Sequence, residues 1–179
     1  MDHISGGERA ISMYRVVDDG GFLAILDPNA YTSFISETFS SYEVLRRHFL
    51  EEMQKGTILV WGTGVANKWR IDVRFEQSDV VGFRQVTGPL NVSDGFLCLS
   101  DYGTLFGAAL NKAASLPPGN KRSLYIQLAS GRYTCRVVQM FDPEDDDCSD
   151  GDHDFLIELY SQESSPEPWL EIPWRFGEA

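Results

Sequence analysis

The chain has 179 residues, with 27 acidic and 15 basic side chains and a formal net charge of −12 at pH 7. Apolar residues make up 42% of it and charged residues 23%, a composition typical of one soluble, folded domain over residues 1–179. These values exclude collagen-like, coiled-coil and wholly disordered proteins, and also a nucleic-acid binder that works through net positive charge.

The first predicted elements are a β-hairpin and an α-helix. Residues 14–25 form apolar runs around Asp19-Gly20, a dipeptide that tolerates the positive φ of a tight turn. Residues 41–55 predict the one clear helix, because Ser40 and Glu43 have the spacing of a capping box. The apolar residues of this helix share one face, which should pack on a sheet: Tyr42, Leu45, Phe49, Leu50 and Met53.

The middle of the chain predicts more strands and a second, weaker helix. Short strands separated by turn residues are expected over residues 58–61, 69–75 and 82–86. A second hairpin is predicted around Asp94-Gly95, since one face of its two strands would then be wholly apolar. A helix is expected over residues 102–110, with Asp101 as its N-cap.

A third hairpin around Ser130-Gly131 and a strand over residues 155–160 complete the pattern. In this hairpin Ile126 would face Cys135. The expected fold is therefore mostly β (α+β): an antiparallel β-sandwich with the helix of residues 41–55 packed on a sheet. Ten residues of the last two hairpins should be buried: Leu90, Val92, Leu97, Leu99, Leu124, Ile126, Leu128, Tyr133, Cys135 and Val137.

The whole net charge belongs to the last 38 residues. Residues 142–179 contain 13 acidic side chains and one basic side chain, Arg175, whereas the acidic and basic side chains of residues 1–141 balance. Within that segment lies an acidic run, residues 142–154, that has eight carboxylates and no Lys or Arg. We expect it to be a loop between two strands and the candidate partner-binding site, through Asp142, Glu144, Asp145, Asp146, Asp147, Asp150, Asp152 and Asp154.

Three interpretations of the acidic run stay open. It can be a solvated surface loop that repels itself into an extended shape. It can be an irregular calcium site, although the helix-loop-helix template fails: with Gly151 at position 6, Cys148 and Ile157 occupy positions that require oxygen ligands. It can also be an anionic patch for a basic protein. Repulsion between the carboxylates of the run costs folding energy, and a basic partner would explain why the chain has such a run. A metal is a weaker explanation, because the spacing of the carboxylates does not fit the calcium-loop template.

The sequence shows no recognisable catalytic set, metal site or cofactor motif. His48 stands near Glu52 without a second histidine, and Cys148 lies among carboxylates that disfavour its thiolate. No apolar stretch approaches the ~20 residues that a membrane-spanning helix needs. The N-terminus does not read as a signal peptide, and three cysteines are too few for a disulfide framework. We therefore expect a cytoplasmic protein that contacts neither membrane nor nucleic acid.

Four tryptophans leave one question open. Trp61 and Trp69 bracket the loop between two predicted strands, whereas Trp169 and Trp174 lie near the C-terminus. They can seal the core and fix the tail, or they can form an exposed aromatic patch. An exposed patch would mark a binding surface, because tryptophan is enriched at interface hot spots.

The third predicted hairpin carries a family resemblance. Residues 122–138 have the form strand, Gly-x-Tyr turn, strand, and they follow the segment 86–95. This succession resembles competence protein J, the nuclease inhibitor of bacterial DNA-uptake systems, and related immunity-like bacterial β-sandwich proteins. The resemblance covers residues 69–160 and leaves residues 1–60 without a counterpart. It implies a bacterial, non-enzymatic protein that neutralises a basic partner such as a nuclease toxin.

Two other classes of function are kept as alternatives. One is a calcium- or ligand-binding β-sandwich module with the acidic run at its rim. The other is an enzyme of unrecognised type, because catalytic residues can come together from distant parts of a chain.

Overall fold

The computed structural model describes residues 12–39, 41–119, 121–145 and 151–175. These residues form two β-sheets. The five-stranded sheet has, in spatial order, β1 (Ser12–Asp18), β4 (Asn67–Arg74), β9 (Phe155–Tyr160), β8 (Gly131–Gln139) and β5 (Arg84–Val92). The four-stranded sheet has β3 (Ile58–Gly62), β2 (Phe22–Leu26), β6 (Phe96–Asp101) and β7 (Tyr125–Gln127). A short 3-10 helix, η1 (Arg122–Leu124), precedes β7.

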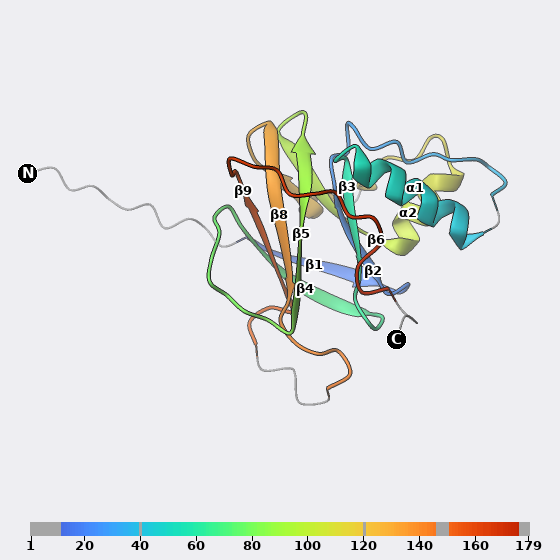
Figure 1. Cartoon of the computed structure of the whole chain (residues 1–179). Helices are drawn as coiled ribbons and strands as arrows, with labels where there is room; N and C mark the ends of the chain where they lie inside the picture. The colour runs from blue at the N-terminus through green and yellow to red at the C-terminus, as the bar shows by residue number, and fades with distance from the viewer. Residues whose placement is uncertain (1–11, 40, 120, 146–150, 176–179) are drawn as a thin grey trace, which may run out of the picture.

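The two α-helices, α1 (Tyr42–Gln54) and α2 (Tyr102–Leu110), lie on the outer side of the four-stranded sheet (Figure 1). The four-stranded sheet is therefore the middle layer of three. This position explains the sequences of β2 and β3, which are buried at every residue. A strand covered on both faces reads as a continuous apolar run rather than as an alternation of apolar and polar residues.

The mostly-β, α+β fold class is confirmed, and so is the packing of the first helix on a sheet. Leu45, Phe49 and Met53 of α1 are buried in the core. One strand pair departs from the antiparallel pattern: β4 and β9 run parallel, with Ile71 opposite Phe155. A parallel pair needs a crossover connection, and here the chain between the two strands supplies β5 to β8.

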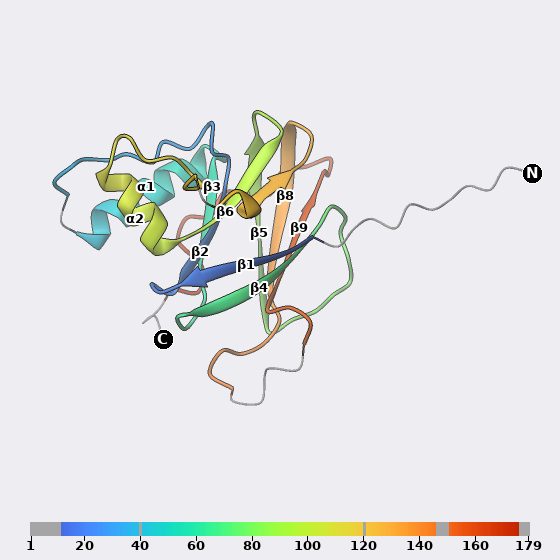
Figure 2. The same ribbon diagram turned by 180° about the vertical axis from the view of Figure 1, so that it is seen from behind.

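All three predicted hairpins are wrong in their pairing. The strands β1 and β2 follow one another in the chain but belong to different sheets, and the same holds for β5 with β6 and for β7 with β8. Each predicted turn instead carries the chain from one sheet to the other, as Figures 1 and 2 show. In place of its predicted partner, β5 pairs with β8, so that Leu90 lies opposite Tyr133.

The predicted core residues are nevertheless in the core. Eight of the ten are buried, and Leu128 and Tyr133 are half-buried against the others. The correct prediction of burial and the wrong prediction of pairing have the same cause. Alternate residues face the core whether two strands pair side by side or stand in facing sheets, so the apolar pattern specifies burial and leaves the pairing open.

The first helix differs in detail from the prediction. It begins at Tyr42, with Ser41 as the N-cap residue, and the Ser41 side chain makes no capping hydrogen bond. The predicted cap, Ser40, lies outside the described residues. The helix has two ion pairs at i,i+3 spacing, Glu43 with Arg46 and Glu52 with Lys55. Gly56 follows the C-cap residue Lys55, at a φ of 72°.

The second helix and its cap are confirmed, and the cap gives a testable expectation. The Asp101 carboxylate accepts hydrogen bonds from the backbone N–H and the hydroxyl of Thr104, at 3.1 and 2.6 Å. We expect Asp101→Ala to lower the free energy of unfolding by about 1–2 kcal/mol, as loss of an N-cap does. Urea denaturation measures this. Asp101→Asn keeps an acceptor oxygen and should cost less; an equal loss would contradict the capping role.

The four tryptophans serve the core and the tail. Trp61 and Trp69 are buried, whereas Trp169 and Trp174 are half-buried in the segment after β9. This segment passes from the five-stranded sheet to the four-stranded sheet (Figure 1), where the Gly62 N–H donates to the Pro173 carbonyl at 2.8 Å. The tail therefore covers β3 and β5, the edge strands on the same side of the two sheets.

Candidate functional site

The acidic run connects the end of β8 to the start of β9, at the lower end of the sandwich in Figure 1. Two backbone hydrogen bonds hold the last residue of the run, Asp154, between β4 and the residue that follows β8. The Met140 N–H donates to the Asp154 carbonyl at 2.9 Å, and the Asp154 N–H donates to the Arg70 carbonyl of β4 at 2.8 Å. The run is therefore attached to three neighbouring strands, β4, β9 and β8.

Asp154 forms an ion pair inside the molecule. Its carboxylate accepts hydrogen bonds from the Arg70 backbone N–H, Nε and Nη2, at 2.8, 3.3 and 3.0 Å. The hydrogen bond to Asp154 raises the pKa of Arg70. Because only 17% of the Asp154 side chain is exposed, this carboxylate secures the end of the run to β4.

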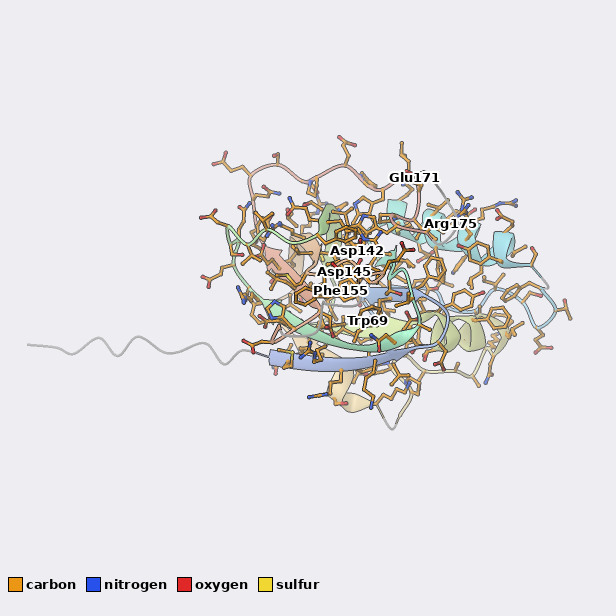
Figure 3. All side chains as sticks on the ribbon, turned by 90° about the horizontal axis from the view of Figure 1, so that it is seen from below. Trp69, Asp142, Asp145, Phe155, Glu171 and Arg175 are labelled. Atoms are coloured by element: carbon orange, nitrogen blue, oxygen red, sulfur yellow. The ribbon has the colours of Figure 1, made fainter. Side chains whose placement is uncertain are left out.

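The other described carboxylates of the run lie nearer to solvent. Glu144, Asp145 and Asp152 are exposed, and Asp142 is half-buried. Asp142 organises a turn, since its carboxylate accepts from the Glu144 N–H at 3.0 Å and its carbonyl from the Asp145 N–H at 3.1 Å. Figure 3 looks onto this end of the sandwich and shows Asp142 and Asp145 over the strand ends that carry Trp69 and Phe155. Three further predicted residues lie outside the described ranges: Asp146, Asp147 and Asp150.

Arg84 also lies at the base of the run. Its Nε donates to the Gln139 side chain at 2.7 Å, and its guanidinium lies 4.6 Å from the centre of the Trp174 ring. Burial lowers the pKa of Arg84, and the carboxylate of Asp142 acts in the opposite direction. Gln139 in turn donates to the Thr63 carbonyl at 2.8 Å, so the base of the run is fixed by a hydrogen-bonded chain.

The described residues offer little for catalysis or metal binding. Burial raises the pKa of Cys98 to about 12 and raises that of Cys135 as well, which makes both poor nucleophiles. His48 is occupied, because its Nε2 lies 2.5 Å from the Thr32 carbonyl oxygen. Within the described ranges no group of three or more metal-ligating side chains comes together, and no helix there is long and apolar enough to cross a membrane. Cys148 lies outside these ranges.

The sequence matches no protein-family model, and it matches none of the curated proteins with which it was compared. Its fold does occur among solved structures. One is ComJ of Bacillus subtilis, an inhibitor of the DNA-degrading activity of NucA. That match has a TM-score of 0.51 and 13% identity, and it covers 84% of this chain and 95% of ComJ. The product of crocagin biosynthetic gene J covers 84% and 96%, with a TM-score of 0.49 and 12% identity.

The chain thus has the fold of ComJ. The resemblance expected from residues 69–160 is confirmed at the level of the fold, and its 84% coverage is wider than that range. At 13% identity the likeness does not extend to a binding site.

Sequence reasoning missed Arg70, which is paired with the run, and Arg84, which lies beside it. Arg70 precedes its partner Asp154 by 84 positions, and Arg84 stacks on a tryptophan from the C-terminal tail. The sequence gives no signal for either contact, because each depends on which strands are neighbours in the sheet. The alternation of β4 still carries a hint, since Arg70 is a charged residue between Trp69 and Ile71, which face the core.

Proposed function

We propose that this protein inhibits another protein, a nuclease, by placing the acidic run against the basic surface that binds nucleic acid. The observation that carries the proposal is a concentration of exposed carboxylates on a loop whose two ends are attached to a sheet. The fold of ComJ, itself an inhibitor of a DNA-degrading activity, supports the same class of function.

The physical basis is charge complementarity. A nuclease binds the phosphates of its substrate with basic side chains, and a row of carboxylates presents a similar array of negative charge. Complementary charge raises the rate of encounter, and the effect weakens as salt screens it. Attachment of the run to β4, β8 and β9 reduces the conformational entropy that binding would otherwise remove.

The proposed contact surface is the acidic run without its last carboxylate. The Asp154 carboxylate forms an ion pair with Arg70 inside the molecule, so we do not include Asp154 in the proposed contact surface. Seven residues remain in the proposal: Asp142, Glu144, Asp145, Asp146, Asp147, Asp150 and Asp152.

The experiment compares two sets of neutral variants. The partner is first captured from extracts of the source cells by the immobilised protein and identified, and its nuclease activity is then measured with and without the inhibitor. We expect the variant Glu144→Gln, Asp145→Asn, Asp152→Asn to associate roughly tenfold more slowly at low salt, with a flatter salt dependence. Its free energy of unfolding, measured by urea denaturation, should stay within about 1 kcal/mol of the wild type, because the three side chains are exposed.

Asp154→Asn is the matched control. It removes one negative charge from the same run, but it also weakens a half-buried ion pair. We expect it to lower the free energy of unfolding by about 1–3 kcal/mol while its association rate stays close to that of the wild type. The proposal fails if the triple variant associates as fast as the wild type at low salt, or if the captured partner is not a nuclease. A large thermal shift with calcium would instead favour a calcium-binding module.

A further inference from the structure

A second concave site lies at the opposite end of the sandwich from the acidic run. The run follows Gln139, the last residue of β8, whereas the turn between β5 and β6 follows Val92, which pairs with Gly131 at the start of β8. A nine-residue strand spans about 30 Å. The residues of this turn therefore cannot share a small ligand with the acidic run.

This site is a pocket of about 600 Å³, larger than the cavity of about 240 Å³ beside the acidic run. Its walls come from four separate parts of the chain: the segment 28–33 after β2, the start of β6, the segment 114–116 after α2, and β7. In Figures 1 and 2 the segments after β2 and after α2 both run along the upper end of the molecule, over the helices. Asp94, in the turn before β6, also lines this site, and we call the site the Asp94 pocket.

Aromatic rings line the Asp94 pocket. Phe96 and Tyr125 lie edge to face, with ring centres 5.6 Å apart, and each is more than one third exposed. The faces of such rings attract cations, and the effect is largest for a cation that is partly removed from water. Two exposed aromatic side chains beside a concave site are also the composition of a binding surface.

The polar side chains that line the pocket include the Asp94 carboxylate, the Asn29 amide and the hydroxyls of Ser33 and Ser115. Asp94 is exposed, and its contact is a long hydrogen bond of 3.5 Å from the Asn29 amide. The described residues that line the pocket include no Lys, Arg or His.

We propose that the Asp94 pocket binds the guanidinium group of an arginine side chain from a protein or peptide. A guanidinium is planar and stacks on aromatic rings, which matches Phe96 and Tyr125. Its several N–H donors can bind both oxygens of the Asp94 carboxylate, whereas lysine presents a compact, strongly hydrated charge. The absence of a lining cation among the described residues leaves the Asp94 charge available to the ligand. This inference does not depend on the acidic run.

The test is an NMR titration of the ¹⁵N-labelled protein with N-acetyl-arginine methylamide. We expect chemical-shift changes confined to the pocket, at Asn29, Phe96 and Tyr125, with a dissociation constant on the order of 1 mM. The matched probes are the citrulline derivative, which has the same shape without the charge, and the lysine derivative. Both should bind at least about tenfold more weakly, because each lacks either the charge or the planar donor array.

Two variants complete the test. Asp94→Asn should weaken arginine binding about tenfold, whereas Asp145→Asn, in the acidic run, should leave it unchanged. Phe96→Leu keeps an apolar side chain and should also weaken binding, because it removes a ring face. The proposal is overturned if arginine and citrulline bind equally, if lysine binds as tightly as arginine, or if no residue of the pocket responds. None of these outcomes bears on the acidic run, so the nuclease proposal stands or falls separately.

Discussion

Replacing Asp18 with alanine is expected to lower the free energy of unfolding by at least about 4 kcal/mol, one of the two largest effects that the structure predicts. The Asp18 carboxylate is 1% exposed and accepts five hydrogen bonds. Three come from the backbone N–H groups of Gly20, Gly21 and Phe22, at 2.9, 2.8 and 3.2 Å. The others come from the Thr63 hydroxyl at 2.8 Å and the Trp69 indole at 3.3 Å.

The size of the expected loss follows from what the substitution leaves behind. Alanine removes the acceptor but not the donors, so buried N–H and O–H groups lose their partner. Urea denaturation monitored by tryptophan fluorescence would measure the loss. Asp18→Asn keeps one acceptor oxygen and should lose less, and Asp19→Ala, at an exposed neighbour, should stay within about 0.5 kcal/mol of the wild type. A loss below about 1 kcal/mol for Asp18→Ala would contradict this account.

The same residues explain why the first predicted hairpin was wrong. The dipeptide Asp19-Gly20 has the chemistry of a hairpin turn, but the carboxylate of Asp18 instead stabilises a turn that carries the chain from β1 to β2 in the other sheet. Turn residues determine that the chain reverses or bends, and not which sheet receives the next strand. A sandwich whose successive strands alternate between sheets therefore has the local sequence pattern of a hairpin protein.

Features that depend on neighbouring residues were predictable. The N-cap of α2 could be predicted because Asp101 and Thr104 are three residues apart, and the buried face of α1 follows from helical periodicity. Burial of eight of the ten predicted core residues followed from the alternation of apolar and polar residues. The parallel pairing of β4 with β9 could not be predicted, because it depends on the path of 80 intervening residues, from Phe75 to Asp154.

The candidate sites also differ in how far the sequence could predict them. The acidic run is visible in the sequence because its eight carboxylates lie within 13 successive residues, 142–154. The assignment of Asp154 to an internal ion pair required the structure, since its partner Arg70 is distant in the chain. The Asp94 pocket was not predicted at all, because its lining residues come from four segments that no local pattern connects.

A buried ion pair joins the two strands that carry the acidic run. Arg136 of β8 and Glu158 of β9 lie opposite one another, with Arg136 Nη1 2.8 Å from Glu158 Oε2. Their side chains are 8% and 0% exposed. The loop between β4 and β5 completes the cluster, because the Ser78 N–H donates to Glu158 at 3.0 Å and Arg136 donates to the Val80 carbonyl.

Glu158→Ala should therefore lower the free energy of unfolding by about 3–5 kcal/mol, because it leaves the buried Arg136 guanidinium without a counter-charge. Arg136→Met should be similarly costly, since it leaves a buried carboxylate. The double variant Glu158→Ala, Arg136→Met should lose less than the sum of the two, by about 1–3 kcal/mol, and urea denaturation of all four proteins measures this coupling. Additive losses would show that the pair is not coupled. Below its unfolding transition, Glu158→Ala should keep the association rate of the wild type, because the pair supports the strands and does not contact the partner.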